Sequence, residues 1–245
     1  MGSFGMSFPS GLVFREYLVY LEVRKDAVND KILSGTIMNT KPNSVRGRPK
    51  KLDRDLVLQT ALIQYWSKGP ANVSISDICN LTGASKPGVY REFGSDDGLK
   101  RAVLEVYHSL AIQPVIDILE KNQPTTDAID ALIGFMTQDR TALGIPQGCL
   151  FVMMRAQSQQ LGPSTCVKLD KIRHSLLNAY GAWIEHSKSR GEFADIPTDI
   201  AALFFDAQHG GAMRMQREGI PNDTVARVLE IALRMPILGP STIGR

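Results

Sequence analysis

The sequence predicts an all-α fold. Between residues 53 and 235, apolar side chains recur at the three- and four-residue spacing of helices that bury one face. Proline and glycine separate these segments, and no sustained alternation of apolar and polar residues or Asn-Gly turn predicts a β-hairpin. The most informative stretch is 74–93, where two short predicted helices flank a tight turn.

The composition is that of a soluble globular protein, with 43% apolar and 22% charged residues in a chain of 245. No apolar run reaches the ~18 residues of a membrane helix, and the N-terminus lacks the pattern of a signal peptide. We therefore expect a cytoplasmic protein with no membrane partner. Cys79, Cys149 and Cys166 are an odd number without metal-ligand spacing, which argues against a disulfide framework or a metal site.

Residues 1–38 carry no clear motif. We expect an N-terminal extension that is disordered, or a misassigned start with Met38 as the true first residue. The alternative is an amphipathic helix from about Leu12 to Val23 that packs on the rest of the protein.

Residues 39–52 form a basic arm that includes Arg46, Arg48 and Lys50. Such a segment is either a solvated tail or an arm that lies along DNA phosphates. Residues 39–108 hold 11 lysines and arginines against 7 aspartates and glutamates, whereas residues 109–245 hold 13 against 14. The positive excess lies around residues 74–93, which favours the DNA-contacting arm.

The next segment, 53–112, predicts a helix-turn-helix unit with a linking helix. A first helix runs from Asp53 or Asp55 to Lys68, and its apolar stripe is assigned to the core. Ser74 with Asp77 suits a capping box, and Gly83 suits the positive φ of a tight turn. Two helices joined by such a turn are the helix-turn-helix pattern of proteins that read the major groove.

The second helix of this pair predicts a contact surface. Ser85 can cap it, and Pro87 lies in its first turn. Val89 and Phe93 are expected to face the core, with Lys86, Gly88 and Arg91 on the outside. The two cations can donate to guanine or to phosphate, and Gly88 would let the backbone approach the bases. The alternative for the cations is a solvated helix face.

The remainder, 113–245, is predicted to be a helical domain. After a helix at 96–112, the expected helices are 114–122, 126–143, 148–161, 164–189, 198–219 and 223–235, with Pro114 and Pro236 among the joints. A pocket there needs polar groups among apolar ones. The ligand-binding candidates are Phe135, Phe151, Met154, Tyr180, Trp183, Phe204 and His209, although most of them are equally explained as core.

Cys149 offers a second kind of site. It opens the helix predicted at 148–161, and a thiol at a helix N-terminus has a lowered pKa and can react with oxidants or electrophiles. The alternative is a small buried hydrophobe.

Residues 61–99 resemble the tetracycline-repressor (TetR) family of bacterial transcriptional regulators. The resemblance is carried by Tyr65-Trp66-Ser67-Lys68-Gly69, by Thr82-Gly83-Ala84-Ser85-Lys86 and above all by Val89-Tyr90-Arg91-Glu92-Phe93-Gly94-Ser95. It implies a homodimer whose N-terminal three-helix domains bind a DNA operator. A larger helical domain would bind a small-molecule effector that releases the DNA, and long helices, here 164–189 and 198–219, would form the dimer interface.

By position, the resemblance makes Tyr90 a phosphate contact. Ser74 and Ser76, at a helix N-terminus, suit a phosphate as well. The predicted DNA-binding residues are therefore Arg46, Arg48, Lys50, Ser74, Ser76, Ser85, Lys86, Pro87, Gly88, Tyr90 and Arg91.

Three acidic residues depart from the family's pattern. Asp96 stands where lysine is usual, Asp97 follows it, and Glu92 stands where histidine or an aromatic residue is commoner. Negative charge is unfavourable beside DNA, so these positions weaken particular phosphate contacts. Lys100 and Arg101 are expected to compensate.

The sequence therefore predicts a ligand-responsive repressor without catalytic residues or a cofactor. One alternative is a regulator that senses oxidants or electrophiles through Cys149. An alternative of another class is a helical small-molecule-binding protein or an enzyme without DNA binding. No phosphate-binding loop, Gly-x-Ser-x-Gly or His-Glu-x-x-His motif supports that class.

Overall fold

The computed structural model describes residues 52–139 and 144–238, and these residues form helices and connecting loops only. The helices are α2 (Arg54–Lys68), α3 (Ile75–Thr82), α4 (Lys86–Phe93), α5 (Asp96–Tyr107), α6 (Gln113–Glu120), α7 (Thr125–Thr137), α8 (Leu150–Ala156), α9 (Pro163–Ser189), α10 (Thr198–Arg217) and α11 (Asn222–Leu238). The predicted all-α fold is confirmed. The N-terminal extension and nearly all of the basic arm lie outside the described residues.

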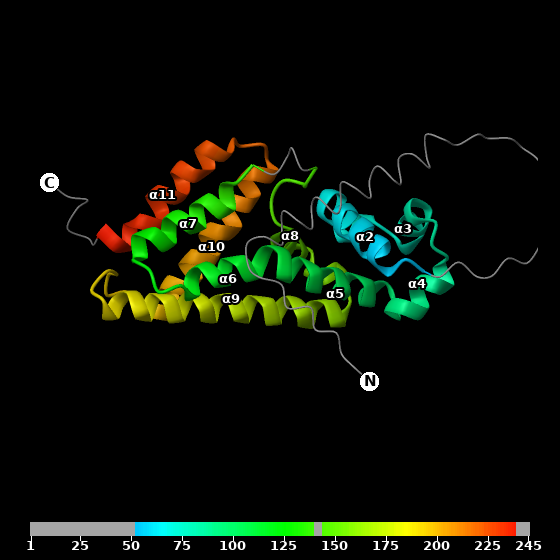
Figure 1. Cartoon of the computed structure of the whole chain (residues 1–245), viewed down its shortest axis with the longest axis horizontal. Helices are drawn as coiled ribbons and strands as arrows, with labels where there is room; N and C mark the ends of the chain where they lie inside the picture. The colour runs from blue at the N-terminus through cyan, green and yellow to red at the C-terminus, as the bar shows by residue number, and fades with distance from the viewer. Residues whose placement is uncertain (1–51, 140–143, 239–245) are drawn as a thin grey trace, which may run out of the picture.

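Helices α2, α3 and α4 gather at one end of the molecule, and we call them the head; α6 to α11 form the body (Figure 1). Within the head, α2 packs on α3 and on α5. Its inner face buries Val57, Leu58, Ala61 and Leu62, each at most 5% exposed. The apolar stripe predicted for the first helix is therefore core.

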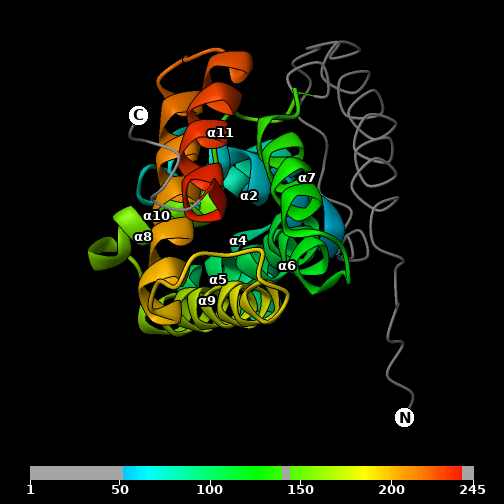
Figure 2. The ribbon, with the colours of Figure 1, turned by 90° about the vertical axis from the view of Figure 1, so that its left-hand side faces the viewer.

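In the body, the long helix α9 packs along α5, α6 and α10, and α11 packs on α7 and α10 (Figures 1 and 2). Buried apolar residues from the head and the body belong to a single core cluster. Aromatic rings fill its far end, where Trp183 meets Phe205 edge to face at 5.1 Å between ring centroids.

The predicted joint at Pro114 is wrong. Residues 96–120 form one continuous helix of 25 residues that links head and body. Its middle, His108–Ile112 (η2), is a π-helical segment that ends at Gln113, whose N–H donates to the carbonyl of His108. Pro114 follows in the first turn of α6, where a missing N–H is tolerated. The domain boundary predicted at 112/113 falls inside this helix and stays a prediction.

The same helix is long and apolar enough to cross a membrane by length and composition. Half of its most apolar 18-residue window is buried inside the fold, as in the core helix of a globular protein.

Three other predicted helix boundaries also need correction. The helix expected at 148–161 begins at Leu150, because Gly148 has a φ of +81° and Cys149 is extended, and it ends at Ala156. The helix expected at 126–143 ends at Thr137, with 140–143 outside the described residues. Pro236 lies inside α11 rather than after it. It is buried there, and its carbonyl accepts a hydrogen bond from the N–H of Ala194, so tertiary contacts outweigh its low helix propensity.

Candidate nucleic-acid interface and cavity

The helix-turn-helix pair α3–α4 is fixed by its own sequence. Ser74 caps α3 in a full capping box: its hydroxyl accepts from the N–H of Asp77, and the Asp77 carboxylate accepts from the Ser74 N–H at 2.9 Å. Gly83 ends α3 with a φ of +68°, which a side chain would strain. Ser85 caps α4 by accepting from the N–H of Gly88. Local signals alone therefore build this turn, as predicted.

Helix α4 presents a basic outer face. Val89 is fully buried and anchors the helix to the core. Lys86 and Arg91 are exposed, and neither forms an ion pair with any described residue; Tyr90 is 47% exposed. Pro87 is exposed beside them. These side chains are available to a ligand outside the protein.

Gly88 does not share this outer face, and its predicted position there is wrong. The residue is buried, and a Cβ at this position would lie 3.0 Å from the Ser85 hydroxyl and 3.6 Å from Leu52. The physical reason is local packing: the side chains of Ser85 and Leu52 cover this backbone position. The DNA contact predicted for Gly88 stays a prediction.

The predicted serine contacts differ in what their hydroxyls already do. The Ser74 hydroxyl donates to the Asp77 carboxylate at 2.7 Å, so a phosphate there would meet a negative charge. The hydrogen bonds from Ser74 hold the pKa of Asp77 below its usual range. Ser76 is half-buried in the first turn of α3, and Ser85 is exposed beside Lys86. Ser76 and Ser85 are therefore better placed than Ser74 to contact a phosphate.

Glu92 and Asp96, the acidic residues nearest α4, each pair with a cation of the protein. Glu92 accepts from Arg54 at 2.9 Å, and that guanidinium also lies 5.7 Å from the Phe93 ring. Asp96 pairs with Lys100, one turn along α5. Lys100 is buried in this pair and Arg101 pairs with Glu105, so the compensation expected of them beside DNA stays a prediction.

Asp97 turns away from α4 towards the body. Its carboxylate accepts hydrogen bonds from Ser164 and Thr165 at the N-terminus of α9. Burial alone would raise the pKa of Asp97, but these hydrogen bonds outweigh it and hold the pKa at about 2. The three acidic departures thus leave the basic face of α4 unopposed.

Arg46, Arg48 and Lys50 lie outside the described residues, so their predicted DNA contacts stay predictions.

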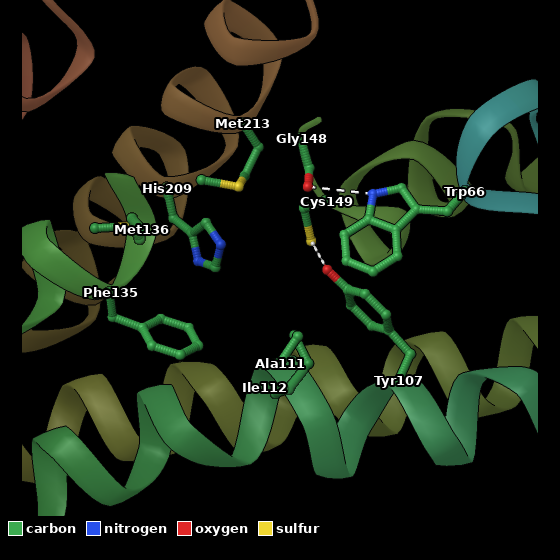
Figure 3. Close-up of a pocket in the computed structure, with 10 residues that line it drawn as sticks. All are labelled: Trp66, Tyr107, Ala111, Ile112, Phe135, Met136, Gly148, Cys149, His209 and Met213. Carbon is green, nitrogen blue, oxygen red and sulfur yellow. Dashed lines mark hydrogen bonds between the residues drawn. The ribbon is translucent and has the colours of Figure 1, made fainter. Parts of the chain in front are cut away.

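A small cavity lies where the head meets the body (Figure 3). Its volume is about 30 Å³, above the roughly 10–15 Å³ that one water molecule needs. The lining residues come from α2, the α5–α6 helix, α7, the loop before α8 and α10: Trp66, Tyr107, Ala111, Ile112, Phe135, Met136, Gly148, Cys149, His209 and Met213.

Two hydrogen bonds tie the wall of this cavity together. The Trp66 indole donates to the carbonyl of Gly148 at 3.2 Å, and the Tyr107 hydroxyl donates to the Cys149 thiol at 3.0 Å. The Trp66 and Tyr107 rings meet edge to face at 5.0 Å. Cys149 is 7% exposed and occupies the N-cap position of a helix of only seven residues, without a capping hydrogen bond from its side chain. Its thiol lines the cavity instead of an exposed helix end.

His209 is the one titratable nitrogen base among the lining residues. It is 7% exposed, makes no hydrogen bond to any described residue, and its ring faces the cavity (Figure 3). Burial lowers the pKa of His209 most, Asp206 opposes this, and Arg155 adds to the lowering. A neutral imidazole in an apolar wall provides one donor and one acceptor for a small uncharged molecule.

The cavity gathers only part of the predicted ligand-binding set. Phe135 and His209 line it. Phe151, Met154, Tyr180 and Trp183 are buried in the core away from it, and Phe204 is half-buried beside Phe205. Those five side chains are large and apolar, which is equally typical of core residues. Trp66 and Tyr107 are absent from the predicted set because both lie in the predicted helix-turn-helix unit 53–112, and no sequence signal places them near Cys149.

No group of three or more histidine, cysteine or acidic side chains able to hold a metal ion occurs within residues 52–139 and 144–238.

Comparisons with known proteins identify the fold. No family model matches the chain. It is 32% identical over 108 residues to the HTH-type transcriptional repressor ComR of Escherichia coli (strain K12) and 25% identical over 114 residues to the HTH-type transcriptional repressor BdcR of the same organism. The matches cover 44% and 46% of this chain, and the chain spans 51% and 58% of the length of these relatives.

Solved structures match over a longer range. A cysteine mutant of the TetR-family regulator CifR in complex with operator DNA superposes with a TM-score of 0.65 at 23% identity, over 77% of this chain and 98% of CifR. A TetR-family regulator from Agrobacterium tumefaciens gives a TM-score of 0.65 at 21% identity, over 74% of this chain and 95% of the other. The chain therefore has the fold of the TetR-family transcriptional regulators, which confirms the resemblance of residues 61–99.

Proposed function

We propose that the protein is a ligand-responsive transcriptional repressor that binds a near-palindromic operator as a homodimer. The observation that carries the proposal is the outer face of α4. It exposes Lys86, Tyr90 and Arg91, and neither cation pairs with an acidic side chain among the described residues, while the neighbouring Glu92 and Asp96 are paired within the protein. Such a face suits the negatively charged major groove.

The roles of these side chains follow from their chemistry. Arginine and lysine on a groove-facing helix donate to the O6 and N7 atoms of guanine or to phosphates, and a tyrosine hydroxyl donates to phosphate. Ser85 and Ser76, at helix N-termini, add phosphate contacts, and the basic arm adds a sequence-independent attraction. A DNA operator implies a cytoplasmic location.

A salt-dependent binding titration on the DNA that flanks the gene tests this proposal. We expect Arg91→Gln to weaken specific binding by about 1–3 kcal/mol and Lys86→Gln to lower the slope of log K against log salt by about 1 if Lys86 contacts a phosphate. Lys171→Gln is the matched control, because Lys171 is an exposed lysine on α9, outside α4. Unchanged binding in both α4 variants would refute the DNA-contacting face.

The dimer is supported by apolar side chains that the monomer leaves exposed. Ile200 and Leu203 on α10 are 54% and 44% exposed, and Val228, Ile231 and Met235 on α11 are 40%, 75% and 45% exposed. Their spacing of three and four residues puts each set on one face of its helix. Helices α10 and α11 pack against each other, so two copies can pair them as a four-helix bundle.

This bundle differs from the one predicted at 164–189 and 198–219. Among its described large apolar residues, α9 exposes only Val167, and its buried face is already used against α5, α6 and α10. We therefore place α11 instead of α9 beside α10 in the interface.

The cavity at the junction of head and body is the proposed effector site. Its apolar lining and the neutral His209 suit a small uncharged ligand, and a larger ligand has to expand it. Because Trp66 belongs to the head and His209 to the body, expansion pushes the two apart. That displacement gives the effector differential affinity for the DNA-free state.

A cavity-filling substitution tests this coupling without knowledge of the effector. Ala111→Leu adds bulk at the cavity wall and should lower operator affinity while the protein stays folded and dimeric. Ala182→Leu, at an exposed position on α9, is the matched control. Equal operator affinity in the wild type and in folded Ala111→Leu would remove the cavity from the mechanism.

Sensing of oxidants or electrophiles through Cys149 is the second candidate, because this thiol lines the same cavity. Any reagent that enters the cavity meets the sulfur. Cys149→Ser should then abolish release from DNA by hydrogen peroxide, whereas Cys166→Ser, at a half-exposed thiol, should not. If release persists in Cys149→Ser, another group responds. The similar proteins are transcriptional regulators, which disfavours an enzyme.

A further inference from the structure

Asp97 connects the DNA-facing end of the molecule to the body. It lies in the first turn of α5, four residues after the end of α4. Its carboxylate accepts from the backbone N–H groups of Ser164 and Thr165 at 2.9 and 3.0 Å and from both hydroxyls at 2.6 and 2.5 Å. The Thr165 hydroxyl also contacts the backbone carbonyl of Asp97 at 3.1 Å.

These bonds make Asp97 the cap of α9, a helix of 27 residues that runs beneath α5 (Figure 1). A carboxylate at a helix N-terminus satisfies N–H groups that have no partner within the helix and interacts favourably with the helix dipole. The N-cap residue of α9 itself, Gly162, has no side chain that could accept hydrogen bonds from these N–H groups. A Cβ on Gly162 would lie 2.3 Å from the Asp97 carboxyl carbon, so the glycine makes room for the carboxylate.

The connection from Asp97 back to α4 is equally short. The N–H of Gly94 donates to the carbonyl of Tyr90 at 2.8 Å, and Ser95 caps α5 by accepting from the N–H of Gly98. Little freedom therefore remains between Asp97 and Tyr90 on the outer face of α4. A displacement of the α9 N-terminus is passed to that face.

A second attachment joins the head to the body through α2. The indole of Trp66, near the end of α2, donates to the carbonyl of Gly148, and Arg217 of α10 donates to the carbonyl of Trp66 at 3.4 Å. Together with the shared core, these two separated attachments hold the orientation of the head, and the Asp97 attachment limits its rotation about the Trp66 side. Loss of the Asp97 attachment leaves the Trp66 attachment and the continuous α5–α6 helix as the pivot.

We infer that Asp97 is a positioning residue for operator recognition: its contact with the N-terminus of α9 fixes the orientation of each head and thereby sets the half-site spacing that the dimer accepts. The inference rests on the proposed function. A dimer reads two half-sites whose separation mirrors the separation of its recognition helices, so heads that pivot tolerate more than one spacing. Asp97 itself faces the body and contacts no DNA.

The test compares operators with different half-site spacing. The operator is first selected with the full-length wild-type protein from random DNA, and versions with one base pair added or removed between half-sites are then made. We expect the wild type to prefer its own spacing by about tenfold or more, and Asp97→Asn to reduce this preference to about two- to threefold. The asparagine would keep the shape of the side chain but direct an amide NH₂ at the donors of Ser164 and Thr165.

Two further variants separate positioning from charge and from stability. Asp96→Asn makes the same chemical change one residue earlier, at a side chain that pairs with Lys100 and does not contact α9, and it should keep the wild-type spacing preference. Ser164→Ala removes one hydroxyl from the α9 side and should reduce the preference in the same direction as Asp97→Asn. The combination of Asp97→Asn with Ser164→Ala should add little to Asp97→Asn alone, because the two residues act through one contact.

Thermal melting and solution mass accompany each titration, so that only folded dimers are compared. If Asp97→Asn melts at a lower temperature but keeps the full spacing preference well below its melting point, Asp97 only stabilises the fold and the inference fails. It also fails if Asp96→Asn loses the preference to the same extent. A wild-type protein that selects no DNA overturns the proposed function itself, which is a different result from selected DNA with an unchanged preference in Asp97→Asn.

Discussion

Ile231 is the most exposed large apolar side chain on α11, at 75%, and it tests the placement of the dimer interface. In a two-fold symmetric dimer each Ile231→Glu substitution acts twice. Burial of one isoleucine side chain contributes about 2 kcal/mol, so loss of both contributes about 4 kcal/mol before the cost of burying the new charges. The dimer dissociation constant should therefore rise about a thousandfold or more.

The assay is sedimentation equilibrium over a range of protein concentrations, with a monomer mass of 27.0 kDa as reference. Val167→Glu is the matched control, because Val167 is 54% exposed on α9 and undergoes the same change from an apolar to an acidic side chain. We expect Ile231→Glu to be monomeric and Val167→Glu to remain dimeric, both with wild-type helix content. A dimer that survives Ile231→Glu but dissociates in Val167→Glu would refute the α10–α11 interface and restore the one that includes α9.

Three further predictions concern stability. Trp66→Phe should lower the free energy of unfolding by about 1–3 kcal/mol in urea titrations, since it leaves the half-buried Gly148 carbonyl without its donor and opens a void. A loss below about 0.5 kcal/mol would contradict the role of that bond. Gly148→Ala should destabilise the fold strongly, because φ is +81° and the new Cβ would lie 2.9 Å from a backbone carbonyl of α10. Gly134→Ala, on α7 with nothing within 4 Å of the new Cβ, should stabilise the fold by about 0.5–1 kcal/mol. Similar effects of the two substitutions on the free energy of unfolding would contradict this geometry. Glu192 accepts hydrogen bonds from Arg190 and Thr125, which hold its pKa at about 2, as for Asp97. Both carboxyls therefore contribute stability that is present above about pH 4 and is lost as the pH falls towards 2. In a plot of melting temperature against pH, Glu192→Gln should reduce the fall in melting temperature at acid pH. An unchanged fall would show that the Glu192 carboxyl does not contribute.

The head could be predicted from the sequence because its signals are local. Ser74 and Asp77 are three residues apart, Ser85 caps the helix that starts one residue later, and Gly83 supplies its own backbone freedom. Each of these features depends on neighbours within one helical turn. The helix-turn-helix boundaries therefore came out as predicted to within a residue.

The cavity and the Asp97 contact could not be predicted, because they depend on partners far apart in the chain. Asp97 and Ser164 are separated by 67 residues, and Trp66 and Gly148 by 82. The sequence shows Asp97 as a charge beside presumed DNA, and only the fold turns it towards α9. For the same reason, apolar residues of the body such as Trp183 were indistinguishable from pocket residues until their burial was known.

Pro114 illustrates a different failure. Proline usually ends a helix because it lacks an N–H and its ring meets the preceding turn. Here the five-residue π segment before it changes the hydrogen-bonding register, and the helix continues. Such a segment has no simple sequence signal, and the apolar pattern on either side fits two helices as well as one.

The continuous α5–α6 helix also bears on how the protein unfolds. Leu99, Val103 and Leu104 of α5 are fully buried, and α5 packs on α2 of the head and on α9 of the body. Separation of head and body would expose both sides of this helix to water at once, so neither part has a complete core without the other. Heating should therefore melt the chain in one cooperative transition, in which head and body lose their helix content together.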